Sequence, residues 1–79
     1  MHELKVDPIP FRRMFECEKT FEVRKNDRDF QVNDVLYLRE YNRELNDYSG
    51  RTMFRRVTYV LEGGQYGIEK GYCVMSIIQ

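Results

Sequence analysis

Apolar and polar residues alternate along most of this chain, and that alternation predicts five β-strands. Period-two alternation places successive side chains on opposite faces of a strand. Valine, isoleucine, tyrosine and phenylalanine, which favour strands, gather in the same segments. The predicted strands cover residues 2–6, 20–25, 35–41, 51–61 and 72–78.

A short helix is predicted between the first two strands. Pro8 suits a first helical position because its missing N–H would be unpaired there, and the aspartate before it is a common capping residue. Phe11, Met14 and Phe15 follow at i, i+3 and i+4, which predicts an apolar stripe that packs on the core. The helix is expected to end near residues 17–18.

The order and character of the later strands predict how they pair. Strands 35–41 and 51–61 flank a polar connection at 42–50, which indicates an antiparallel hairpin. The glycine-rich segment 63–67 indicates a turn, and the nearly continuous apolar run at 72–78 favours a central strand. Uninterrupted alternation in the longest strand places four apolar side chains on one face: Met53, Val57, Tyr59 and Leu61.

These elements predict one α+β domain over residues 1–79. Five short strands and one helix are too few for a sandwich of usual size. A small, strongly twisted, mostly antiparallel sheet that closes into a partial barrel, with the helix at one end, uses them best. The apolar fraction of 42% and aromatic fraction of 14% suffice for one core and exclude a disordered chain.

The charge balance restricts the ligands that the chain can bind. A third of the residues are charged but the formal net charge is zero, so a polyanion could be held only by a local patch. Cys17, Cys73 and His2 form no metal-binding spacing, and neither a metal nor another cofactor is expected. The chain has no apolar run near the ~20 residues of a membrane helix and no secretory signal, so we expect a cytoplasmic protein.

One strand concentrates the candidate chemistry. Thr20, Glu22 and Arg24 share one face of strand 20–25, about 7 Å apart in steps, and Lys19 stands at its start. Lys19 and Arg24 could hold a phosphate, and Glu22 could accept hydrogen bonds from the amino group of a base. The alternative is a solvated face, on which such ion pairs contribute less than about 1 kcal/mol.

The same strand carries a family resemblance. The run from Cys17 to Arg24 resembles the ASCH-domain signature G-x-K-x-x-E-x-R, and nearly the whole chain resembles the DUF3850 family of small bacterial and phage proteins. The resemblance implies a PUA-like β-barrel, a fold associated with RNA binding, with the charged strand lining a cleft. Two glycines of the pattern are replaced, by Cys17 and by Asn33. Asparagine tolerates the positive φ that such a turn requires.

From this resemblance we expect an RNA- or nucleotide-binding domain. Arg55 and Arg56 are further candidates for a basic rim around the cleft. The expected contact residues are Lys19, Thr20, Glu22, Arg24, Lys25 and Arg28.

Two other functions stay open. Some ASCH relatives resemble amidohydrolases of a modified pyrimidine nucleoside, in which case Lys19, Thr20 and Glu22 would be the catalytic candidates, although no base is evident beside the hydroxyl. A protein–protein adaptor that uses exposed tyrosines and phenylalanines is the third possibility. The pattern does not decide whether the domain forms homo-oligomers.

Overall fold

The computed structural model describes all 79 residues, and the predicted strands and helix are present in the predicted order. Two boundaries differ from the prediction by more than one residue. The helix ends two residues early, and the fourth strand begins four residues early, inside the expected polar connection. The elements are β1 (His2–Val6), α1 (Pro8–Phe15), β2 (Phe21–Lys25), β3 (Val35–Asn42), β4 (Asp47–Glu62) and β5 (Tyr72–Ile78).

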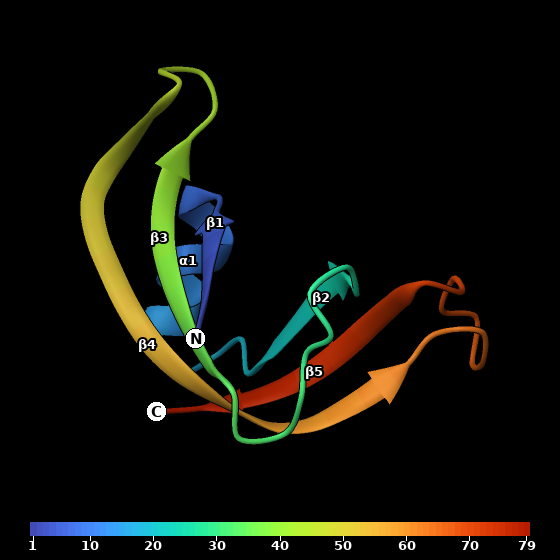
Figure 1. Cartoon of the computed structure of the whole chain (residues 1–79). Coiled ribbons are helices and arrows are strands. Elements are labelled where there is room, and N and C mark those ends of the chain that lie inside the picture. The colour runs from blue at the N-terminus through green and yellow to red at the C-terminus, as the bar shows by residue number, and fades with distance from the viewer.

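All five strands belong to one sheet with the order β1-β3-β4-β5-β2. The β1–β3 pairing is parallel and the other three are antiparallel, so the predicted hairpin of β3 and β4 and the interior place of β5 are confirmed. The sheet curls into a half-barrel in which the two edge strands, β1 and β2, face each other across the open side (Figure 1). The predicted α+β partial barrel is therefore confirmed.

The curl depends on β4, whose sixteen residues pair first with β3 and then with β5. The β4–β5 register shifts between Val57 and Tyr59, so Thr58 is an extra residue, and such a bulge bends and twists a strand. The bulge also reverses the alternation. Tyr59, predicted to lie on the same face as Val57, is 62% exposed, and Val60 packs against the core instead.

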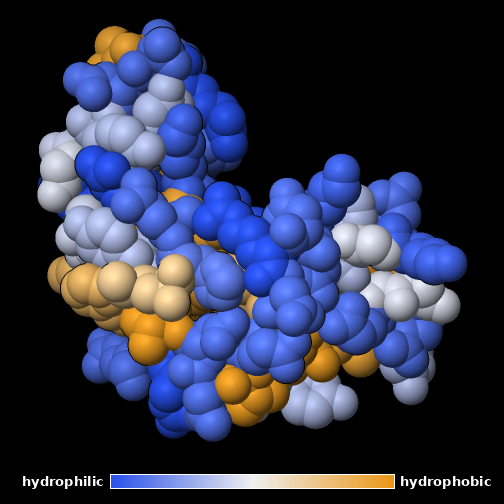
Figure 2. Space-filling model, in the orientation of Figure 1, coloured by the Kyte–Doolittle hydropathy of each residue, from blue (hydrophilic) through white to orange (hydrophobic).

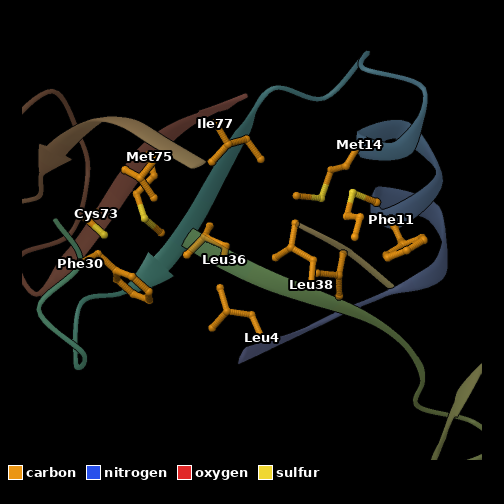
Figure 3. Packing of buried hydrophobic residues seen from close by; sticks show 12 residues of the cluster. Leu4, Phe11, Met14, Phe30, Leu36, Leu38, Cys73, Met75 and Ile77 are labelled. Carbon is orange, nitrogen blue, oxygen red and sulfur yellow. The ribbon is translucent and has the colours of Figure 1, made fainter. Parts of the chain in front are cut away.

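The core fills the concave side of the sheet and extends under the helix. Phe11 and Met14 of α1 pack beside Leu38 of β3, as Figure 3 shows. Phe15, the third residue of the predicted stripe, is 65% exposed because two turns of helix bury only a narrow stripe. With eight residues, this helix is too short to cross a bilayer. The cluster contains Leu4, Val6, Phe11, Met14, Phe30, Leu36, Leu38, Met53, Val57, Cys73, Met75 and Ile77.

Two predicted turns are present. Asn33 has φ +77°, so asparagine does serve the position at which the family pattern has glycine. The glycine-rich segment connects β4 to β5, and a Cβ on Gly63 would lie 2.0 Å from the carbonyl oxygen of Glu69. Glycine is required at residue 63 because two parts of the backbone approach each other there.

Candidate functional site

The start of the charged strand is positioned by the end of α1. The Cys17 amide donates to the Met14 carbonyl (3.0 Å) and the Glu18 amide donates to the Arg13 carbonyl (2.9 Å), with Cys17 at φ +60°. This is the Schellman arrangement, in which the left-handed residue after a helix is usually glycine. The glycine of the resembled signature thus coincides with a helix cap. Cys17 lines neither of the hollows described below, so it does not narrow a cleft.

The polar face of β2 lies on the inner side of the sheet. Glu22 is paired with Met75 of β5, which is fully buried, so Glu22 shares the concave face and is only 5% exposed. Phe21 and Val23 alternate with it and are about half exposed, at 48% and 51%. The strand therefore presents its apolar side chains to solvent and its carboxylate to the interior. The solvated-face interpretation does not hold for Glu22.

Two cations hold the buried carboxylate. Lys19 Nζ lies 3.0 Å from Glu22 Oε1, and Arg24 Nε lies 2.5 Å from Glu22 Oε2. Lys19 and Arg24 are mostly covered, with side-chain exposures of 21% and 27%. Lys19 Nζ also donates to the carbonyl of Phe21 (2.8 Å) and lies 4.7 Å from the centroid of its ring. The sequence spacing did bring Lys19, Glu22 and Arg24 into one cluster, as expected.

Arginine side chains, not backbone pairing, connect the two edge strands. Arg24 Nη2 donates to the carbonyl of Lys5 (2.6 Å), and Arg28 Nη1 donates to the carbonyl of Glu3 (2.7 Å). Glu3 and Lys5 are alternate residues of β1, so the two guanidinium groups bind the same free edge of that strand. We call these two contacts, from Arg24 and Arg28 to the β1 carbonyls, the seam, and two hollows adjoin it.

A hollow of about 340 Å³ lies at the seam, next to Glu22. This volume is within the range of small-ligand sites in proteins. The surface between the two halves of the curled sheet carries mostly strongly hydrophilic side chains (Figure 2). Four cations outnumber two carboxylates in the lining although the whole chain is neutral: Lys5, Lys19, Arg24 and Arg43 against Asp7 and Glu22.

The other expected contact residues are placed differently. Arg28 is at the seam, whereas Thr20 and Lys25 line none of the main hollows. Lys25 lies on the outer face of β2, two residues after Val23. Arg55, proposed for a basic rim, is buried. It donates to the Met14 carbonyl at the end of α1 (3.1 Å), so its placement on the rim was wrong.

Two lining residues were not predicted from the sequence. Lys5 belongs to β1, and Arg43 to the β3–β4 turn, where its Nε donates to Asp7 Oδ1 (2.8 Å). Both are far from residues 19–28 in the sequence, and each looks like an ordinary surface cation. Only the curl of the sheet brings them to the cluster.

The two perturbed ionisable groups lie outside this hollow. A hydrogen bond from the Gln31 amide, followed by one from the His2 ring, lowers the pKa of Asp34 below its usual value. Burial raises the pKa of the Cys73 thiol. No group of three or more histidine, cysteine or acidic side chains is arranged to hold a metal ion.

Comparison with known proteins gives a family but no function. The family model described as "Domain of unknown function (DUF3850)" matches residues 1–77. A search of curated proteins finds no match. The match covers every residue of the seam and of the buried cluster.

Proposed function

The chain belongs to the DUF3850 family, and we propose that its cleft binds single-stranded RNA or a nucleotide through Lys19, Glu22 and Arg24. One observation carries the proposal: a carboxylate only 5% exposed is held between two cations beside an open, mostly basic hollow. An RNA ligand also agrees with the cytoplasmic location expected from the sequence.

The energetics of the cluster favour a binding role over a purely structural one. Removing charges from water costs several kcal/mol per ion, and a well-packed apolar replacement is often equally stable or more stable. Glu22 lies opposite Met75 on the concave face, where an apolar side chain would extend the core. A charged residue there is therefore better explained by a ligand than by stability.

The cluster keeps hydrogen-bonding capacity for a ligand. A carboxylate has about four lone-pair positions, and Glu22 uses one on each oxygen. The remaining positions could accept the amino group of a base, as in carboxylate recognition of cytosine. Arg24 and Lys19 each retain N–H groups for a phosphate oxygen. The resemblance to ASCH and PUA-like domains supports the same ligand class.

The test is an NMR amide titration of the labelled protein, first with a short mixed-sequence RNA and then with single nucleosides. The proposal predicts shifts centred on residues 19–28 with RNA, weakened by Lys19→Ala. Lys70→Ala is the matched control, because it removes one exposed lysine from the β4–β5 loop, away from the cleft. Unfolding of the Lys19→Ala variant would make the cluster structural and refute the proposal.

Other outcomes would identify the alternative functions. Shifts with nucleosides alone, together with turnover of acylated cytidine that Lys19→Ala abolishes, would indicate the amidohydrolase. Thr20, the hydroxyl which that activity would use, lies outside the lining of the hollow. An absence of shifts with either ligand would favour an adaptor, for which the exposed Phe21 and Tyr59 are available.

A further inference from the structure

A second hollow, of about 430 Å³, adjoins the first along the seam. The two share Lys5, Arg24 and Arg43, and the second adds Arg28 and Tyr48. We infer that the second hollow is a phosphate subsite, so that the cleft binds the backbone of a strand of at least two nucleotides in preference to a single nucleoside. This inference rests on the proposed function.

Lys5 is the strongest evidence for an anion-binding position in this hollow. Its Nζ lies 4.3 Å from the centroid of the Tyr41 ring and 5.8 Å from that of Tyr48, which hold the ammonium group by cation–π attraction. It has neither a carboxylate within ion-pair distance nor a side-chain hydrogen bond. The ammonium group is thus positioned by two rings while its hydrogen-bonding capacity stays free for a ligand.

The arginines of the second hollow also have free donors. A guanidinium group carries five N–H donors in a planar fork, which matches two oxygens of a phosphate. Arg43 uses only its Nε, on Asp7 Oδ1, and Arg28 uses only Nη1, on the carbonyl of Glu3. Arg24 still has Nη1 free.

The charge of this hollow selects an anion. Four cations line it, and the single carboxylate in the lining is Glu3, which already pairs with Arg39 (3.1 Å). A phosphodiester fits better than an isolated anion because the cations shared by both hollows form a continuous basic track. Such a track follows the backbone of a single strand, while the neighbouring hollow at Glu22 takes a base.

The experiment compares ligands of increasing length at fixed salt: cytidine, the dinucleoside monophosphate CpC and a mixed RNA hexamer. The variants are Arg43→Ala, Lys5→Ala, Lys19→Ala and the control Lys70→Ala. Arg43 and Lys5 are exposed, and the seam uses only the backbone carbonyl of Lys5, so both variants are expected to fold. Isothermal calorimetry measures affinity, and amide spectra verify the fold.

We expect CpC and the hexamer to bind more tightly than cytidine. Arg43→Ala and Lys5→Ala should each weaken hexamer binding about tenfold or more, in line with loss of one charge-assisted contact. Cytidine binding should weaken less than hexamer binding, because cytidine carries no phosphate for either cation to hold. Log affinity falls as log salt rises, and each variant should make this slope shallower by about 0.7.

Three results separate the possible failures. Hexamer binding that Lys19→Ala weakens but Arg43→Ala and Lys5→Ala do not would overturn the second subsite and leave the proposed function standing. Equal affinity for cytidine and CpC would overturn the subsite as well. If poly-aspartate of equal charge displaces the hexamer, the ligand of the second hollow would be an acidic protein and not the RNA backbone.

Discussion

Replacement of Cys17 by glycine tests why the ASCH-domain signature has a glycine at this position. Cys17 has φ +60° at the end of α1, where its amide and that of Glu18 satisfy carbonyls of the last turn. If the glycine of the family pattern is a helix cap, then Cys17→Gly should stabilise the domain without changing the cleft. If the glycine allows close approach of a ligand, the same change should instead tighten RNA binding.

The expected gain in the free energy of unfolding is the difference between two opposing terms. A non-glycine residue in the left-handed conformation costs about 1–2 kcal/mol, which glycine removes. Glycine loses more backbone entropy on folding, which costs about 0.5–1 kcal/mol. With both terms at the same end of their ranges, the net stabilisation should be about 0.5–1 kcal/mol. For a domain of this size that raises Tm by roughly 2–8 °C.

Urea and thermal unfolding of the wild type, Cys17→Gly and Cys17→Ala measure this difference. The alanine variant is the matched control. It removes the thiol, and with it the weak contact from Gln79 Nε2 (3.4 Å), but keeps the Cβ that causes the strain. It should therefore stay within about 0.5 kcal/mol of the wild type. Equal stability of the glycine and alanine variants would refute the cap explanation.

Three further predictions concern groups outside the cleft. The Gln31 amide lowers the pKa of Asp34, which means that the ionised carboxylate stabilises the folded state. This contribution to the free energy of unfolding is complete above the usual pKa of 3.8 and is lost as pH falls through the lower folded-state pKa. Asp34→Asn should accordingly reduce the free energy of unfolding at pH 7 and lose that difference in strong acid, measured by urea unfolding at both pH values. Burial raises the pKa of the Cys73 thiol, whereas Cys17 is exposed. At pH 8 a thiol reagent should therefore modify one thiol per folded protein, that of Cys17, and should reach Cys73 only on unfolding. Rapid modification of both thiols would contradict this. Arg55→Met removes the hydrogen bonds that the buried guanidinium donates to the carbonyls of Met14 and Phe54, although the Met14 carbonyl keeps the one from the Cys17 amide. The change should cost about 1–3 kcal/mol by urea unfolding, and unchanged stability would show that these two hydrogen bonds contribute nothing net.

The local pattern was sufficient for the elements of the fold. Alternation and turn residues located every strand, and Pro8 located the first residue of the helix. Asn33 was correctly expected to accept a left-handed turn. These features depend on neighbours a few residues apart, which a sequence displays directly.

The failures arose where distant pairing overrides a local pattern. The bulge at Thr58 reverses the alternation of β4, and nothing near Tyr59 in the sequence signals the extra residue. Arg55 resembles a surface cation in the sequence, but the sheet places it under the end of α1. Each position is decided by the partner strand or helix against which it packs.

In the candidate site, too, some features were predictable from the sequence and others were not. The i, i+2 spacing of Glu22 and Arg24 determined that they share a face of one strand, because side chains alternate along any strand. That this face is the interior one depends on pairing with Met75 of β5. Lys5 and Arg43 join the cleft because the sheet curls until its two edges face each other. Spacing along the chain determines relations within one strand, whereas burial and the meeting of distant cations arise only from how the strands pack.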